Sequence, residues 1–210
     1  MADLSDFWLS PSEFLKKNLF YMRGNGKSVA GLYNFKFEDA TQEYGARCRH
    51  KTEHWWQRDS DVRVWFVSAD AEGGEKAPVF WLPYKENGIC KAAIDQDAPF
   101  LFTASLTGCT FGSVMYNNGM VEVCHANFQT AEGTLDETRM SQETCWCQKR
   151  LEQKKYREKI YGSAVKDVNR QASMGATVVG VKGKNNWTFY AQQWENLDGT
   201  NFNYFELIEL

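Results

Sequence analysis

The sequence predicts an α+β domain, in which helices are kept apart from a system of mainly antiparallel strands. A well-marked helix start lies near the N-terminus, and beyond it short runs rich in Val, Phe, Trp and Tyr alternate with Gly, Asn, Asp and Pro. Runs of this composition between such residues are typical of strands joined by turns. The length of 210 residues suits a single domain over 1–210.

Two helices are predicted. The motif Ser10-Pro11-Ser12-Glu13 combines a serine N-cap, a proline at the first helical position and a glutamate that completes a capping box. It predicts a helix over 11–23, ended by Gly24-Asn25-Gly26. The polar stretch Ser141–Tyr161 contains neither Gly nor Pro, so we expect a second, surface helix there.

Strands are predicted wherever apolar runs lie between turn residues. Asn87-Gly88, Asn118-Gly119 and Asp198-Gly199 supply the turns. The clearest runs are Val62–Ser68, Pro78–Tyr84, Phe100–Leu106, Val114–Tyr116, Met120–Ala126, Ala176–Val181, Trp187–Trp194 and Asn203–Ile208.

Composition argues against several classes of partner. The net charge of −3 and the pI of about 5.7 disfavour nucleic acid, because duplex-binding domains carry a basic surplus. No apolar run has the length of a membrane span, and Met1–Asp6 lacks the start of a secretory signal. The cysteines are spread along a chain that has its own core, so we expect mostly free thiols, as in a reducing cytosol. They are Cys48, Cys90, Cys109, Cys124, Cys145 and Cys147.

Cys109 and His125 lie on two apolar runs joined by Asn117-Asn118-Gly119. With a two-residue loop, Cys109 opposes Phe128, and Cys109 and His125 lie on opposite faces of the sheet. With a three-residue loop, Cys109 opposes Asn127, and His125 becomes its diagonal neighbour on the same face, with backbone positions about 7 Å apart. A glycine as the third loop residue suits the left-handed backbone that this second arrangement needs.

A cysteine and a histidine on one face make a nucleophile and its base. A free thiol has a pKa of about 8.5, and a neighbouring imidazole accepts its proton. Gly108 leaves room for a substrate beside the sulfur, and backbone N–H groups near Cys109 suit an oxyanion. The structural alternative is that Cys109 is a small buried hydrophobe and His125 a hydrogen-bonded structural residue. His50 and His54 are the other histidines available as a base.

Several segments resemble one family of toxins. Leu106-Thr107-Gly108-Cys109 resembles the Leu-Ser-Gly-Cys motif of the cytotoxic necrotizing factor-like glutamine deamidases, and it is closest to the Burkholderia lethal factor-like members. Phe80–Lys85 resembles the Trp-Leu-Pro-aromatic-Lys strand upstream of that motif. Thr103 and His125 stand where the family has a site threonine and its histidine. The resemblance covers about 79–127; Thr107 replaces the usual serine, and the interval from Cys109 to His125 is longer.

The resemblance implies a β-sandwich of mixed sheets surrounded by helices and loops. It implies that Cys109 is the nucleophile, that His125 is its base, and that Thr103 orients His125 or the substrate amide. The supporting motif residues are Leu106, Thr107 and Gly108. A glutamine of a host protein is then converted to glutamate through a thioester, without a metal or organic cofactor.

The resemblance also implies a biological setting. The host substrate is a translation-initiation helicase, so that translation initiation is inhibited, or a Rho-type GTPase. The protein is then a bacterial toxin or effector, a monomer that is secreted or delivered into the host cytosol.

Two other functions remain open from the sequence. A cysteine hydrolase or a transglutaminase uses the same pair of residues, and a transglutaminase differs in using an amine instead of water. A non-catalytic protein- or glycan-binding module has its aromatic side chains exposed on a binding surface. The alternative is that these aromatic side chains form the core. The tryptophans considered for such a platform are Trp55, Trp56, Trp65, Trp81, Trp187 and Trp194, of which Trp81 is expected in the core.

Overall fold

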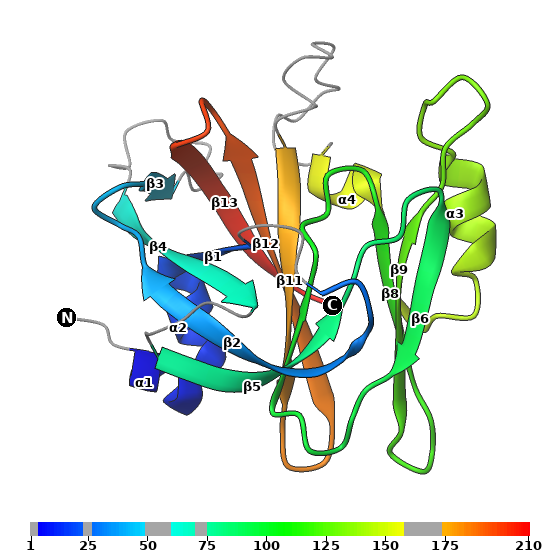
Figure 1. The fold of residues 1–210 in the computed structure, drawn as a ribbon, viewed down its shortest axis with the longest axis horizontal. Coiled ribbons are helices and arrows are strands. Elements are labelled where there is room, and N and C mark those ends of the chain that lie inside the picture. Colours follow the sequence, from blue (N-terminus) through cyan, green and yellow to red (C-terminus); the bar gives the residue numbers. More distant parts are fainter. Residues whose placement is uncertain (1–3, 23–26, 49–59, 70–74, 158–173) are drawn as a thin grey trace.

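The computed structural model describes residues 4–22, 27–48, 60–69, 75–157 and 174–210. Within these ranges the protein is mostly β-structure, with two sheets and four short helices (Figure 1). The helices are α1 (Leu4–Leu9), α2 (Pro11–Lys17), α3 (Glu137–Glu143) and α4 (Gln153–Arg157). The predicted β-rich character is confirmed, although the helices contribute less than an α+β class suggests.

The larger sheet is mixed and closes on itself. In the described part of the chain its strands are β1 (Asn18–Met22), β2 (Gly31–Asp39), β3 (Gly45–Cys48), β4 (Ser60–Ala69), β5 (Glu75–Leu82), β7 (Phe100–Thr103), β11 (Met174–Lys182), β12 (Trp187–Asn196) and β13 (Asn201–Glu209). They are ordered β1-β4-β2-β5-β7-β11-β12-β13-β3. The pairs β1–β4, β5–β7 and β13–β3 are parallel. Because β3 also pairs with β4, the strands from β4 round to β3 close into a barrel.

The smaller sheet is antiparallel throughout its described strands. These are β6 (Gly88–Ala93), β8 (Thr110–Met115), β9 (Val121–Asn127) and β10 (Lys149–Leu151). Their order is β10-β8-β9-β6. The predicted mixed pairing therefore applies to the larger sheet and not to this one.

The predicted strands all overlap observed ones, with shifted ends. Pro78–Tyr84 ends at Leu82 and Phe100–Leu106 ends at Thr103, whereas the run predicted from Val114 begins at Thr110. The sequence did not single out β1, β2, β3, β6 or β10. Strands β1, β6 and β10 lie at a sheet edge, β2 carries many polar side chains, and β3 is very short, so each gives a weak signal in the sequence.

The core between the two sheets comes from one face of each. Leu82, Leu101 and Phe189 of the larger sheet are buried against Phe111 and Val123 of the smaller one. Side chains alternate along a strand, so the neighbours of these residues face the other way. In β7, Leu101 and Thr103 therefore face the smaller sheet.

The opposite face of the larger sheet encloses the N-terminal segment. Phe7 of α1 and Phe20 of β1 are fully buried with Phe35, Trp81 and Phe102 of the surrounding strands. Several of these rings meet edge to face, for example Phe20 and Phe102 with centroids 5.4 Å apart. Figure 1 shows α1 and α2 beneath the curled strands. The aromatic residues of the N-terminus thus fill the inside of the curl.

The predicted helix over 11–23 is wrong in its second half. Helix α2 ends at Lys17, and Asn18–Met22 forms β1, which pairs with β4. Ser10 makes no side-chain cap, so the predicted capping box does not form. Gly24-Asn25-Gly26 lies outside the described residues. Pairing with a neighbouring strand overrides the local helical preference of this segment.

A buried glutamine on β12 fixes the change from helix to strand. Gln192 Nε2 donates to the carbonyl oxygens of Leu15 (2.9 Å) and Asn18 (2.5 Å), and the backbone N–H of Phe20 donates to Gln192 Oε1 (2.9 Å). The Gln192 side chain therefore satisfies backbone groups that the end of α2 and the start of β1 leave unpaired.

The predicted helix over Ser141–Tyr161 is not one continuous helix where it is described, because only its overlaps with α3 and α4 are helical. Helix α3 ends at Glu143, where the hydroxyl of Thr144 donates to the carbonyl oxygen of Met140 (2.7 Å). The chain then forms β10, whose buried Leu151 pairs with Phe111 of β8, and only afterwards α4. The poor helical spacing of the apolar residues in this stretch is explained by this break; residues beyond 157 lie outside the description.

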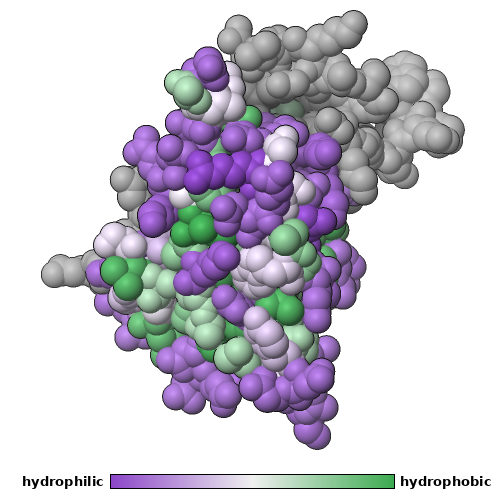
Figure 2. Space-filling view, turned by 90° about the vertical axis from the view of Figure 1, so that its right-hand side faces the viewer, coloured by the Kyte–Doolittle hydropathy of each residue, from purple (hydrophilic) through white to green (hydrophobic). Residues whose placement is uncertain are grey.

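Helix α3 covers the outer face of the smaller sheet. Met140 is packed against Ala126 and Phe128, and Figure 1 shows α3 on the side of β9 away from the larger sheet. The surface on this side is largely hydrophilic around small hydrophobic patches (Figure 2). None of the helices in the described ranges is long and apolar enough to cross a membrane.

We expect Gln192→Leu to destabilise the fold, because it leaves the carbonyls of Leu15 and Asn18 and the N–H of Phe20 buried without the partner they have now. The expected loss in free energy of unfolding is about 2–4 kcal/mol, measured by urea denaturation. Gln142→Leu, at an exposed position of α3, is the matched control and should change stability little. Equal effects of the two substitutions would contradict this role for Gln192.

Candidate active site

The hairpin between β8 and β9 has the three-residue loop. Met115 pairs with Val121, and the backbone N–H of Tyr116 donates to the carbonyl oxygen of Met120 (2.8 Å). Gly119 has φ +81°, and its N–H donates to the carbonyl oxygen of Tyr116 (2.9 Å). The second of the two predicted registers is therefore the correct one.

This register places Cys109 and His125 on the same side of the smaller sheet. Phe111 lies directly across from His125, and Thr110 across from Ala126. Cys109 precedes β8 by one residue and is buried in the same cluster as Phe111. Cys109 is 4% exposed and His125 is fully buried. Both therefore belong to the layer between the sheets.

Thr103 and His125 are joined by a short hydrogen bond across that layer. The distance from Thr103 Oγ1 to His125 Nδ1 is 2.7 Å, and the Thr103 hydroxyl donates to the carbonyl oxygen of Leu82 at 2.9 Å. A hydroxyl has one proton to donate. Since that proton goes to Leu82, the threonine oxygen accepts the Nδ1–H of His125. The imidazole therefore carries its proton on Nδ1 and a lone pair on Nε2.

The Nε2 atom of His125 is buried and has no hydrogen-bond partner among the described residues. A buried polar atom without a partner is uncommon in folded proteins and calls for an explanation. Burial lowers the pKa of His125 to about 3. The imidazole is therefore neutral at physiological pH, and its Nε2 is able to accept a proton.

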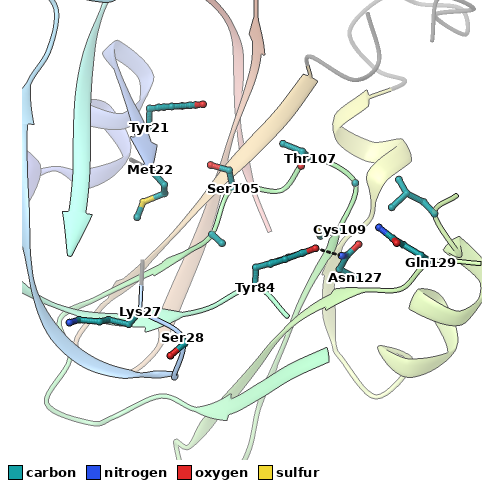
Figure 3. Close-up of a pocket in the computed structure, with 13 residues that line it drawn as sticks. Tyr21, Met22, Lys27, Ser28, Tyr84, Ser105, Thr107, Cys109, Asn127 and Gln129 are labelled. Atoms are coloured by element: carbon teal, nitrogen blue, oxygen red, sulfur yellow. Dashed lines mark hydrogen bonds between the residues drawn. The ribbon is translucent and has the colours of Figure 1, made fainter. Parts of the chain in front are cut away.

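Cys109 lies in the wall of a cavity of about 820 Å³. Figure 3 shows Cys109 with Tyr84 and Asn127 on one side of this space, and Tyr21 and Met22 of β1 on the other. The lining residues are Tyr21, Met22, Lys27, Ser28, Tyr84, Ala104, Ser105, Thr107, Gly108, Cys109, Asn127, Gln129 and Leu135. The cavity has polar and apolar walls, and a side chain that enters it reaches the cysteine.

The residues before Cys109 hold it at the cavity wall. Leu106 is buried. Its backbone N–H donates to the carbonyl oxygen of Ala176 of β11 (2.8 Å), and the N–H of Ala176 donates to the carbonyl oxygen of Leu106 (2.9 Å). Thr107 is exposed and lines the cavity. Gly108 has φ +156°, and a Cβ there would lie 2.6 Å from Cδ1 of Leu135, so the position requires glycine.

The carbonyl group of Cys109 is anchored from α4. The hydroxyl of Tyr156, which is fully buried, donates to the Cys109 carbonyl oxygen at 2.9 Å. This bond fixes the backbone at Cys109. The polar stretch that the sequence assigns to a surface helix thus contributes a residue that holds Cys109 in place.

Sequence reasoning missed two residues beside Cys109. Asn127 Nδ2 donates to the Tyr84 hydroxyl oxygen at 2.9 Å, and the Tyr84 ring lies edge to face against His125, with centroids 6.0 Å apart. Burial raises the pKa of Tyr84, and negative charge on Cys109 raises it further. Tyr84 is therefore a protonated donor close to the sulfur. The signals were present: Asn127 lies opposite Cys109 in the preferred register, and Tyr84 belongs to the Trp-Leu-Pro-aromatic-Lys segment.

Other candidates from the sequence do not join this site. His50 and His54 lie outside the described residues. No group of three or more His, Cys, Asp or Glu side chains suited to a metal ion occurs in the ranges that the structure describes. The tryptophans considered for a binding platform are buried where they are described, namely Trp65, Trp81, Trp187 and Trp194. Trp55 and Trp56 lie outside those ranges.

No protein-family model and no curated protein matches this sequence. The features of the protein that bear on its function are therefore the geometry around Cys109 and the resemblance of its motif.

We expect His125→Gln to change how stability depends on pH. The pKa of His125 is lowered to about 3 in the folded protein, and histidine in an unfolded chain titrates at about 6.5. Between these values the unfolded state binds the extra proton. The stabilising effect of the neutral, buried imidazole is therefore complete above pH 6.5, and it falls by about 1.4 kcal/mol per unit as the pH decreases toward 3.

Urea denaturation of both proteins between about pH 7 and pH 5 measures this effect, because most carboxyl groups remain ionised in that range. The wild type should lose more stability than His125→Gln over the interval. If the two proteins lose the same amount, then His125 is not buried in its neutral form.

Proposed function

We propose that the protein is a cysteine-dependent protein-glutamine amidohydrolase, with Cys109 as nucleophile, His125 as general base and Thr103 as the residue that orients His125. One observation carries the proposal: the hydrogen bond from His125 Nδ1 to Thr103 leaves the lone pair of Nε2 without a partner among the described residues, in the layer that also contains Cys109. A histidine with only a structural role would have both ring nitrogens paired or solvated.

The low pKa of His125 determines how the thiol is activated. A neutral imidazole in a buried site does not hold a permanent thiolate–imidazolium pair. Proton transfer from Cys109 to Nε2 therefore accompanies attack of the sulfur on the substrate. Nε2 makes no hydrogen bond to any residue in the described ranges, and bonds between catalytic groups commonly tighten when the substrate binds.

The reaction proceeds in two balanced halves. In the first, the Cys109 sulfur bonds to the side-chain amide carbon of a glutamine, and the thiol proton passes to His125 Nε2. His125 returns this proton to the departing nitrogen, so that ammonia leaves and a thioester remains. In the second half, His125 takes a proton from water, the hydroxide oxygen attacks the thioester carbon, and the thiol is restored with glutamate as product.

Tyr84 supports the charge that develops on the amide oxygen. Its own oxygen accepts a hydrogen bond from Asn127, so its proton is available for another acceptor. Tyr84 lines the cavity together with Cys109. A preorganised donor at the position of a developing oxyanion lowers the barrier of acyl transfer. Tyr84 is thus the proposed oxyanion donor, with backbone N–H groups near Cys109.

The substrate is a protein whose glutamine side chain enters the cavity. The resemblance to deamidase toxins favours a host translation-initiation helicase or a Rho-type GTPase, with delivery into the host cytosol. The transglutaminase alternative shares the first half-reaction and differs in the second, where an amine replaces water.

We expect incubation of the purified protein with host-cell lysate to convert a specific glutamine to glutamate, detected by peptide mass spectrometry. Cys109→Ser should abolish the conversion, and His125→Gln should slow it by about 10²–10⁴-fold. Cys145→Ser is the matched control, because Cys145 is an exposed free thiol outside the cavity lining. Added primary amine separates the alternatives, since a transglutaminase forms the amine adduct in preference to glutamate.

Thr103→Val and Thr103→Ser test the orienting role directly. Valine removes the hydroxyl that accepts Nδ1–H, whereas serine retains it, so activity and the rate of Cys109 alkylation by iodoacetamide should fall in Thr103→Val alone. A Cys109 that is alkylated equally fast in the wild type, Thr103→Val and His125→Gln would contradict the proposed base.

Tyr84→Phe removes only the phenolic hydroxyl. We expect kcat to fall by about 10²–10³-fold with little change in KM. The rate of Cys109 alkylation should be unchanged, because alkylation forms no oxyanion. Tyr116→Phe is the control, since the Tyr116 hydroxyl bonds to Glu122 on the hairpin, outside the cavity lining. A fall in alkylation that matches the fall in kcat would instead assign Tyr84 to activation of the thiol.

A further inference from the structure

Two free thiols meet on the outer face of the smaller sheet, on the opposite side of β9 from His125. The Sγ atoms of Cys124 on β9 and Cys147, between α3 and β10, lie 3.6 Å apart. Cys124 is fully buried and Cys147 is 8% exposed. Neither residue has a part in the proposed deamidation.

The sheet provides the space in which these two sulfurs meet. Cys124 lies directly across from Gly112 of β8. A Cβ at Gly112 would lie 2.4 Å from Cys147 Sγ and 3.0 Å from Cys124 Sγ. Cys147 is held over this gap by a turn in which its N–H donates to the carbonyl oxygen of Thr144 (3.0 Å). The absence of a side chain at position 112 therefore allows the two thiols to be in contact.

The electrostatic surroundings make the two thiols unequal. A hydrogen bond joins the two sulfurs. With Cys124 as its donor, this bond, helped by the charges of Arg150 and Lys91, lowers the pKa of Cys147 although partial burial and Glu122 oppose the shift. The same hydrogen bond, together with burial, raises the pKa of Cys124. Cys147, which also has the exposed edge, is thus the more acidic and more reactive of the two thiols, and Cys124 is the thiol that reacts second.

We propose that Cys124 and Cys147 form a reversible disulfide when the protein meets a hydroperoxide. In the first step the Cys147 thiolate attacks one oxygen of hydrogen peroxide, the O–O bond breaks, and a sulfenic acid and hydroxide form. In the second step Cys124 loses its proton and attacks the Cys147 sulfur, expelling the hydroxyl group, which leaves as water. Two thiols and one peroxide thus give one disulfide and two waters. An added dithiol reduces the disulfide back to the two thiols by thiol–disulfide exchange.

The position of the pair distinguishes it from the other described thiols. Cys90 pairs with His125 in the register of β6 and β9, so its side chain lies on the inner face of the sheet. Cys109 also belongs to the inner layer. Cys145 is exposed, two residues from Cys147. The Cys124–Cys147 disulfide requires the sulfurs to approach by about 1.5 Å, to the usual S–S bond length.

The disulfide would fasten the α3 layer to the strand that carries His125. It joins β9 to the turn that follows α3, and α3 already contacts β9 through Met140. The intervening chain includes Leu135, which lines the cavity beside Gly108. Closing this loop raises stability by restricting the unfolded chain. In the folded protein the new bond also ties the segment that contains Leu135 to β9, so oxidation stiffens one wall of the cavity.

The test uses the full chain treated with a small excess of hydrogen peroxide, followed by alkylation in denaturant and tryptic mapping without reduction. Cys109 and Cys124 lie on one tryptic peptide, between Lys91 and Arg139, and Cys145 and Cys147 lie on the next. The double substitution Cys109→Ser with Cys145→Ser therefore leaves one cysteine on each peptide. The expected result is a crosslinked pair of peptides that dithiothreitol separates.

Oxidation should also raise Tm by about 5–10 °C, reversibly. Cys147→Ser, on the same double background, should give no crosslink and no rise in Tm. Because Cys109 is absent, the outcome does not depend on the proposed deamidase activity. The proposal is overturned if Cys124 remains alkylatable after peroxide treatment, or if Cys124 is crosslinked to Cys90 instead. Should a variant fail to fold, fragmentation of the crosslinked peptides from the unsubstituted chain shows whether the disulfide joins Cys124 to Cys147 or involves Cys109 or Cys145.

Discussion

The hydrogen bond between Thr103 and His125 links the two sheets, and the arrangement of the candidate site depends on it. Thr103 is the register partner of Leu82 in the parallel pair β5–β7, and its hydroxyl donates to the Leu82 carbonyl. The same oxygen accepts the Nδ1–H of His125 from β9. Thr103 and His125 are fully buried, so breaking either bond leaves polar groups that cost about 1–3 kcal/mol each. Thr103 therefore fixes three things at once: the register of β5 and β7, the position of the smaller sheet against the larger one, and the tautomer of the imidazole.

Burial of His125 separates the proposed base from the proposed nucleophile, Cys109, which lines the cavity. His125 lies behind the cavity with no exposure. A solvated histidine adopts several orientations and either tautomer. The buried position fixes one tautomer and one orientation of the imidazole, at the expense of basicity, since the pKa falls to about 3, and of stability in acid. Proteins commonly depart from complete polar satisfaction at functional sites, and Nε2 of His125 is such a departure.

The sequence was sufficient for features that depend on local patterns. The hairpin register followed from Gly119 and the alternation of side chains, and it correctly brought Cys109 to the face of His125. Features set by distant partners were missed. Asn18–Met22 is a strand because β4 pairs with it and Gln192 bonds to the backbone of Asn18 and Phe20, and neither effect is visible in the local sequence. The role of Tyr156 likewise depends on a contact across 47 positions in sequence. The likeness of the motif to deamidase toxins supplied the reaction, which no spacing of residues could specify.

Strand β9 carries both proposed chemistries because its side chains alternate. His125 faces the layer between the sheets, and its neighbour Cys124 faces α3 and Cys147. The backbone between them is held by β8 on one side and β6 on the other. A change in the outer layer therefore reaches His125 through the position of a rigid strand and needs no direct contact. The two faces also differ in what they require: the inner one needs an unpartnered nitrogen, and the outer one needs two sulfurs in contact over a glycine. A substitution at Gly112 would displace the thiols first, and it would disturb the base only as far as β9 itself moves.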